Sequence, residues 1–274
     1  QAKKRNKLPK IVIPVHFGGQ SCDMLSIYKL SQTYGFKIIE DASHAIGGLY
    51  NGKKVGSCIY SDICVFSFHP VKIITTGEGG MALTNSTSIA RKIEKFRSHG
   101  IVSKKNNMVK RRSNEIWNYQ QFELGLNYRM TDIGASLGLS QIDKINLFVN
   151  KRRQIADFYD KKLKSLHLKK QKQINKALST YHLYPIRLDL KNNTKTQKMI
   201  YKELHRKGIH VNIHYIPVYR HPYYEKLGFK EGYCPESEKY FREALSLPIF
   251  PKMTKSDLIR VKQSLESIVD KKKL

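Results

Sequence analysis

The feature that most constrains the fold is an alternation of short apolar runs with one helical run in the first quarter of the chain. Apolar runs of strand length occur at KIVIPVHF (10–17), FKIIED (36–41) and DICVFSF (62–68). Between the first two lies CDMLSIYKLSQTYG (22–35), whose apolar spacing is helical and whose last residue is a glycine that stops the helix. Strands that alternate with helices predict an α/β domain with a mostly parallel sheet, and we expect 10–17 to be a buried strand.

The rest of the chain predicts a long helix followed by a second domain. Apolar residues keep helical spacing from about 132 to 166, which indicates one connecting helix. Strand and helix patterns then restart, with strands at 181–190 and 209–217 and helices at 194–208, 235–245 and 254–269. We therefore predict a large domain over residues 1–150, and a connecting helix with a small α+β domain over residues 151–274.

The net charge of +28 raises the question of a nucleic-acid partner. The lysines are spread along the chain, many on the outer faces of predicted helices, and no nucleic-acid-binding motif interleaves them with aromatic residues. We expect a solvated basic surface and no nucleic-acid partner. The four cysteines form no CxxC pair, no metal-ligand pattern is present, and no apolar run has the length of a membrane span, so a cytoplasmic protein without a metal is expected.

One lysine stands alone in an otherwise uncharged stretch. Between residues 63 and 77 only Lys72 is charged, although 26% of the chain is Asp, Glu, Lys or Arg. Asp41 ends one predicted strand and Ser67 ends the next, and ligands of parallel α/β sheets collect at such strand ends. An amine in apolar surroundings, a carboxylate and a hydroxyl are the groups that pyridoxal-phosphate chemistry requires. From the residues alone, a solvated loop lysine and a helix-capping aspartate remain open as alternatives.

Six segments in sequence order resemble the DegT/DnrJ/StrS family of sugar aminotransferases, which are fold-type I pyridoxal-phosphate enzymes. They are EDASHAIGG (40–48), SFHPVKIITTGEGGM (67–81), FRSHG (96–100), LGLNYRMTDIGASLGLSQ (124–141), HYIPVYRHPYY (214–224) and ALSLPIFPKMT (244–254). Within the family, PVHFGGQSCDM, EDASHA and SFHPVK are most similar to members that act in pseudaminic acid synthesis. The resemblance implies amination of a UDP-4-keto-6-deoxy-N-acetyl-hexose, with glutamate as amino donor, in a homodimer with shared active sites.

The resemblance also assigns site residues. It makes Lys72 the catalytic lysine that binds the cofactor covalently and moves the substrate proton, and Asp41 the acid paired with the pyridine nitrogen. His44 stands where many members have a glutamine near the ring hydroxyl, and Ser67 matches the phosphate-binding serine. Asn127 matches an asparagine that reaches the phosphate from the neighbouring subunit. Members that dehydrate instead of aminating carry histidine at the lysine position, so Lys72 favours amination.

Four further residues and one basic run are less certain members of the site. His16 ends the first predicted strand and either faces the sugar or is a satisfied core histidine. His214 and Tyr215 end a small-domain strand and are candidates for contact with the nucleotide sugar. Trp117 and the basic run KKNNMVKRR (104–112) form a loop that is either near the nucleotide or simply solvated.

One departure from the family is the start of the chain. Family members have, before the PVHF segment, a Gly-Thr phosphate loop and an aromatic residue that stacks on the pyridine ring, and neither is in this sequence. We therefore expect the chain to correspond to the later two thirds of a longer protein and to bind the cofactor weakly by itself. The alternative function is a non-catalytic remnant that serves as an interaction subunit.

Overall fold

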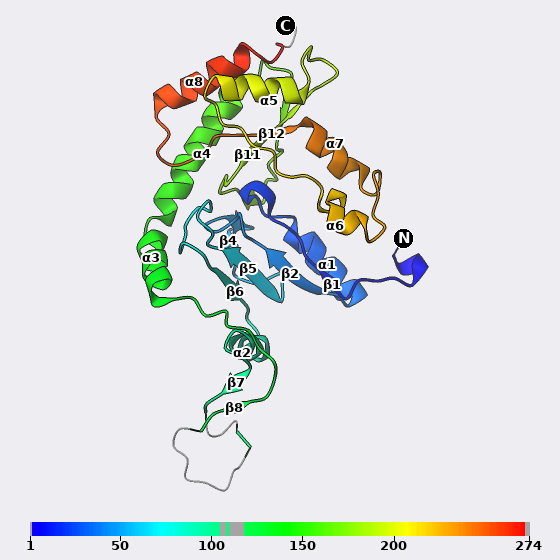
Figure 1. Ribbon diagram of the computed structural model, residues 1–274, viewed down its shortest axis with the longest axis vertical. Helices are drawn as coiled ribbons and strands as arrows, with labels where there is room; N and C mark the ends of the chain where they lie inside the picture. The colour runs from blue at the N-terminus through cyan, green and yellow to red at the C-terminus, as the bar shows by residue number, and fades with distance from the viewer. Residues whose placement is uncertain (1, 105–107, 110–117, 272–274) are drawn as a thin grey trace. The chain divides into compact units, whose positions relative to one another are not determined.

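The computed structural model describes residues 2–104, 108–109 and 118–271 (Figure 1). Trp117 and most of the basic run 104–112 lie outside the described residues. The chain divides into two compact units. The first comprises Gln1–His16 with Ser21–Ile145, and the second comprises Phe17–Gln20 with Asn146–Leu274.

The first unit is built on a four-stranded sheet in the order β1-β2-β5-β6 (Figure 1). Strands β1 (Ile11–Val12), β2 (Lys37–Asp41) and β5 (Ile63–Ser67) are parallel, and β6 (Gly80–Leu83) pairs antiparallel with β5. In β2 the burial alternates along the strand, with Ile38 and Glu40 buried on one face. The sheet is therefore the mostly parallel one that the sequence predicts, closed on one side by an antiparallel strand.

The helices of the first unit begin and end at the residue types that physical chemistry favours. Helix α1 (Met24–Tyr34) ends at Gly35, whose φ of 74° is in the left-handed region. Helices α2 (Thr87–Phe96) and α3 (Asp132–Ile142) begin after Ser86 and Thr131, whose side chains accept hydrogen bonds from backbone N–H groups of the first turn. The remaining short elements are η1 (Lys3–Arg5), β3 (Leu49–Tyr50), β4 (Lys53–Lys54), β7 (Ile101–Val102) and β8 (Gln120–Gln121).

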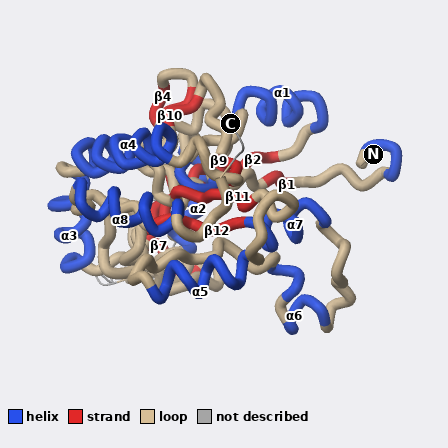
Figure 2. Tube along the Cα trace, turned by 90° about the horizontal axis from the view of Figure 1, so that it is seen from above, coloured by secondary structure: helices blue, strands red, loops and turns tan. Residues whose placement is uncertain are grey.

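The second unit packs helices against a three-stranded antiparallel sheet in the order β12-β11-β9 (Figure 2). Its core is a single cluster of buried residues that includes Tyr159, Ile186, Leu204 and Leu265, contributed by three helices and the sheet. The elements are η2 (Phe17–Gly19), α4 (Ile145–Lys162), β9 (Leu168–Lys170), β10 (Ala177–Leu178), β11 (Tyr184–Leu188), α5 (Gln197–Arg206), η4 (Val218–Arg220), α6 (Pro222–Glu225), α7 (Pro235–Glu243), β12 (Ala244–Leu247) and α8 (Lys255–Glu266).

The segment Phe17–Gln20 is held inside this second unit by backbone hydrogen bonds. Thr180 N donates to Gly19 O at 3.0 Å, and Leu183 N donates to Gly18 O at 3.3 Å. A Cβ on Gly19 would lie 2.2 Å from Thr180 Oγ1, so only glycine permits this approach. The sequence pattern does not predict that these four residues belong to the second unit.

Three predicted elements are wrong in the structure. The expected buried strand 10–17 is a two-residue edge strand, because Pro14 has no N–H to donate and the chain turns into η2. The expected single helix 132–166 is two helices, separated by a turn in which Lys144 N donates to Gln141 O. The expected strand 209–217 is absent, since pairing with β12 is limited to an isolated bridge at Asn212. Among the described helices, none is long and apolar enough to cross a bilayer.

Candidate active site

Asp41 and Ser67 lie at the carboxyl ends of neighbouring parallel strands. The register of β2 and β5 places Asp41 opposite Val65, so Ser67 follows two residues farther along β5. Both side chains are half-buried. Ser67 Oγ accepts the backbone N–H of His69 at 3.4 Å. The strand ends therefore present a carboxylate and a hydroxyl at one edge of the sheet, as the sequence predicts.

Lys72 lies in the loop that follows β5. The loop begins with a turn in which Lys72 N donates to His69 O at 2.9 Å, and the next residues, Ile73 and Ile74, are buried. The Lys72 side chain is half-buried, and this burial lowers the pKa of its amine while the negative charge of Asp41 acts in the opposite direction. The structure thus places the amine within electrostatic range of Asp41, and the lowered pKa increases the fraction of neutral, nucleophilic amine.

The loop returns to the sheet through the glycine-rich segment 77–80. Gly77 has a φ of 81° and Gly79 a φ of 151°, conformations that residues with a side chain rarely adopt. At Gly80 a Cβ would lie 2.8 Å from Phe66 O of the neighbouring strand β5. The glycines therefore allow the tight return of the chain to β6 that keeps Lys72 close to the strand ends.

The carboxylate of Asp41 is held by the turn that follows β2. Its Oδ1 accepts the backbone N–H of Ser43 at 3.1 Å, and Ala42 N donates to Val65 O at 2.9 Å. His44 is buried in the same turn. His44 therefore lies three residues from the candidate acid, and its contact with a cofactor ring remains a prediction.

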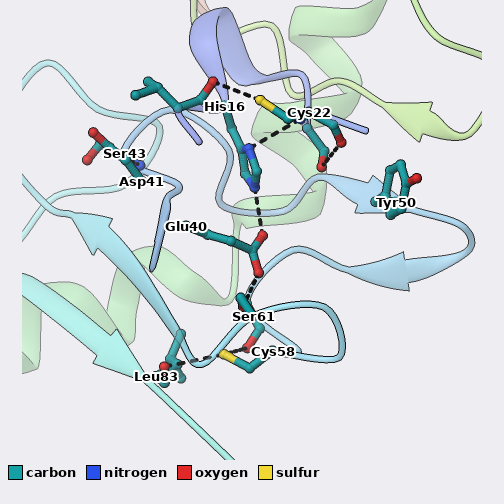
Figure 3. A network of polar contacts seen from close by, with 12 residues as sticks. His16, Cys22, Glu40, Asp41, Ser43, Tyr50, Cys58, Ser61 and Leu83 are labelled. Atoms are coloured by element: carbon teal, nitrogen blue, oxygen red, sulfur yellow. Dashed lines mark hydrogen bonds and ion pairs between the residues drawn. The ribbon is translucent and has the colours of Figure 1, made fainter. Parts of the chain in front are cut away.

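A buried polar network lies beside Asp41 (Figure 3). His16 Nε2 lies 2.7 Å from Glu40 Oε2, the other oxygen of Glu40 accepts a hydrogen bond from Ser61 Oγ, and Cys22 N lies 3.3 Å from His16 Nδ1. Burial disfavours a charged ring, but the side chains of Cys22 and Glu40 outweigh it and raise the pKa of His16 to about 9.

His16 is 0% exposed and both ring nitrogens have contacts, which favours a satisfied core histidine over a sugar contact. Its partners Glu40, Ser61 and Cys22 were not predicted from the sequence. The sequence does contain a signal for a buried acid, which is the Glu-Asp pair that ends β2. Adjacent strand residues point to opposite faces of the sheet, so only one of the two acids can face a ligand and the other must find a partner on the opposite face.

Asn127 belongs to a different part of the first unit. Its backbone forms an antiparallel bridge with Ser98, and the flanking Tyr128 N donates to Arg97 O at 2.9 Å. The side chain of Asn127 is exposed. Its contribution to a neighbouring subunit's site remains a prediction.

His214 and Tyr215 lie in the second unit. His214 Nδ1 is 2.8 Å from Ser246 Oγ of β12, and this contact anchors the start of the segment that continues to η4. Tyr215 is exposed. Their role as substrate contacts remains a prediction.

The groups at the sheet edge fit pyridoxal phosphate. The cofactor has an aldehyde for the Lys72 amine, a pyridine nitrogen for the Asp41 carboxylate, and a phosphate for the Ser67 hydroxyl. The fit rests on the half-buried amine near the Asp41 charge and on two strand ends that are adjacent in the sheet. Within the described residues, no group of three or more His, Cys, Asp or Glu side chains is placed to hold a metal ion.

Comparison with known families identifies the class of protein. Residues 2–266 match the model of the DegT/DnrJ/EryC1/StrS aminotransferase family. The chain belongs to this family, and its fold is that of the fold-type I pyridoxal-phosphate transferases.

Individual relatives narrow the resemblance. The chain is 38% identical over 260 residues to the UDP-4-amino-4,6-dideoxy-N-acetyl-beta-L-altrosamine transaminase of Campylobacter jejuni, with 94% of this chain and 65% of that protein covered. It is similar to the structure of Helicobacter pylori PseC, an aminotransferase of pseudaminic acid biosynthesis, with a TM-score of 0.84 and 31% identity over 93% of this chain and 65% of that one. The putative sugar aminotransferase Spr1654 of Streptococcus pneumoniae, in its PLP form, gives a TM-score of 0.81 and 25% identity over 94% and 68%. The chain thus spans about two thirds of the length of these relatives.

Proposed function

We propose that this chain carries the lysine-bearing part of a pyridoxal-phosphate-dependent nucleotide-sugar aminotransferase. Its substrate is a UDP-4-keto-6-deoxy-N-acetyl-hexose and its amino donor is glutamate. The observation that carries the proposal is the half-buried Lys72 amine, whose pKa is lowered by burial, within range of the Asp41 carboxylate at the strand ends. The similarity to an altrosamine transaminase supports the choice of sugar.

Each residue has a defined task in this proposal. The bound cofactor supplies an electron-accepting ring that makes a proton on the attached carbon removable. Asp41 would keep the pyridine nitrogen protonated, Ser67 would donate a hydrogen bond to the phosphate, and Lys72 would hold the cofactor through its aldehyde. Lys72 would also move the substrate proton as a general base and acid. Over the whole reaction the sugar gains the amino group at C4, and the donor leaves as a 2-oxo acid.

Chemical trapping tests the role of Lys72. The chain is incubated with excess pyridoxal phosphate, reduced with borohydride, digested and mapped by mass spectrometry. We expect the pyridoxyl group on Lys72 and its loss in Lys72→Ala, while Lys29→Ala, a change of an exposed lysine on α1, leaves the label in place. A label spread over surface lysines, with none enriched at Lys72, would contradict the assignment and favour a non-catalytic remnant.

The proposal includes a homodimer, which the exposed apolar residues around Asn127 support. Residues of the 119–142 segment, on either side of Asn127, present large apolar side chains to solvent, with Leu124 90% and Ile133 86% exposed. Such a patch on a folded unit is typical of an interaction surface. We propose that a second copy of the chain covers this patch and brings Asn127 to the partner's phosphate site.

Subunit mixing tests the shared site. In a preparation with transaminase activity, Lys72→Ala and Asn127→Ala are each expected to be inactive, because each lacks one group of every site. Each mixed dimer holds one site with both groups intact, so it is expected to have up to half the activity of the unchanged dimer. Failure to recover activity, with subunit exchange demonstrated by mass spectrometry, would show that Asn127 acts within its own subunit.

A further inference from the structure

The two acids at the end of β2 face opposite sides of the sheet. Residues of a strand alternate between faces, so Glu40 shares the buried face with Ile38, while Asp41 lies on the other face. Glu40 is 5% exposed, and both of its oxygens are engaged, by His16 and by Ser61. The proposed chemistry uses Asp41 and leaves this buried pair without a role.

The backbone of Asp41 is fixed by the residues next to His16. Asp41 N donates to Pro14 O at 3.0 Å, and His16 N donates to Asp41 O at 3.0 Å, which forms a parallel bridge between Val15 and Asp41. His16 therefore contacts this strand end twice. Its N–H holds the carbonyl of Asp41, and its ring holds the side chain of Glu40 on the opposite face (Figure 3).

The segment that carries His16 has little else to hold it against β2. Strand β1 ends at Val12, Pro14 has no N–H, and the side chains of Ile13 and Val15 are 58% and 48% exposed. Two backbone hydrogen bonds at the end of an edge strand are easily broken by fraying. The contact between His16 and Glu40 is thus a buried side-chain interaction between this segment and β2 that helps to keep these bonds in register.

We propose that His16 and Glu40 are positioning residues that hold the carboxylate of Asp41 toward Lys72. His16 contacts one carboxylate oxygen of Glu40, and Ser61 donates a hydrogen bond to the other. With Glu40 held at both oxygens, the end of β2 cannot rotate and withdraw Asp41 from the sheet edge. A role of this pair in catalysis rests on the proposed function. The position of the Asp41 carboxylate relative to Lys72 can be tested without a cofactor.

The amine of Lys72 reports the position of Asp41. Two influences act on its pKa: burial lowers it, and the Asp41 charge raises it. Withdrawal of Asp41 therefore lowers the pKa of Lys72 further, whereas opening of the loop to water removes the effect of burial and raises it toward its ordinary value. Displacement of Asp41 therefore lowers the pKa of Lys72, whereas a general loss of structure raises it, so the two outcomes can be told apart.

The experiment is competitive acetylation of the chain at a series of pH values, with the pKa of Lys72 read from peptide mass spectrometry. The test variant is His16→Leu/Glu40→Leu, which replaces an ion pair by an apolar pair and so leaves the net charge of the pair unchanged. We expect the pKa of Lys72 to fall by about 1, the effect of losing a nearby opposite charge. The control Arg187→Met/Glu243→Leu removes an ion pair of the second unit, 2.6 Å long, and should leave Lys72 unchanged.

An unchanged or higher pKa of Lys72 in the test variant would overturn the proposal. If the leucine pair does not fold, His16→Asn/Glu40→Gln gives the same test, since asparagine is too short to reach Glu40 as the imidazole does. Pyridoxal-phosphate trapping on the unchanged chain separates the two proposals. Trapping at Lys72 with no pKa shift in the variant refutes only the positioning role, and a pKa shift without trapping refutes only the proposed function.

Discussion

The buried pair of His16 and Glu40 predicts that the first unit loses stability at alkaline pH. Burial opposes a charged ring, yet the side chains of Cys22 and Glu40 dominate and raise the pKa of His16 from 6.5 to about 9. The folded state therefore binds this proton more tightly than the unfolded state does. The stabilisation is fully present below pH 6.5 and is lost as the pH rises through 9.

The size of the effect follows from the two pKa values. A difference of 2.5 between 9 and 6.5, at about 1.36 kcal/mol per pKa unit, gives about 3 kcal/mol. The side chain of His16 is fully buried, so solvent does not screen the interaction. In hydrogen exchange this free energy corresponds to about a 300-fold change in the protection of amides that open with the strand end.

Two measurements test this prediction. Nuclear magnetic resonance of ¹³Cε1-labelled histidine, with the signal assigned by its loss in His16→Gln, should give a midpoint near 9 rather than 6.5. Protection factors of the β2 amides Ile38 and Asp41, compared between about pH 6 and pH 10, should fall in the unchanged chain and change much less in His16→Gln. Both are repeated with Cys22→Ser, which removes a second titratable side chain next to the ring.

A ring that titrates at or below its ordinary value would refute this reasoning. His16 would then be neutral at pH 7 and donate one N–H to Glu40, with Cys22 N donating to the other ring nitrogen. In that case the β2 amides keep their protection to pH 10.

Two further predictions concern backbone geometry. Gly100→Ala should destabilise the region around β7 and β8 by about 1–3 kcal/mol more than Gly35→Ala does, because a Cβ at Gly100 would lie 1.8 Å from Glu123 O. Both glycines have φ near 73°, at 72° and 74°, and Gly35 has nothing within 4 Å, so the difference in denaturation free energy isolates the clash; equal losses would contradict it. Thr254→Ala should cost about 1 kcal/mol in thermal unfolding, since Thr254 and Asp257 form a capping box at the start of α8, and an unchanged midpoint would show that water replaces the cap.

The elements that the sequence predicted well are those whose signals are local. Strand β2 and helix α1 lie within the predicted ranges, because an apolar run and a terminal glycine are both visible in a few residues. The sequence also predicted that Asp41 and Ser67 lie at the same edge of the sheet, because parallel strands bring their carboxyl ends together. Lys72 stood out as a candidate because no other charged residue lies between residues 63 and 77, and its role remains a prediction.

What sequence reasoning missed depends on contacts between distant residues. The partner of His16 is 24 residues away, and the pairing requires the register of β1 against β2, which periodicity does not give. The turn at 143–144 leaves the apolar spacing on both sides nearly in phase, so two helices look like one. The segment 209–217 has strand-like residues, but after Asn212 its polar groups bond locally or to side chains, as His214 does to Ser246.

The four residues Phe17–Gln20 have a consequence for dissecting the protein. The chain crosses between the units at 16–17, returns at 20–21, and crosses again at 145–146. We therefore expect the two fragments of a single proteolytic cut at 145–146 to stay together under native conditions, because the first carries the carbonyls of Gly18 and Gly19 that bond to Leu183 and Thr180 in the second. The nicked molecule should elute as one species on a native column and divide only in denaturant.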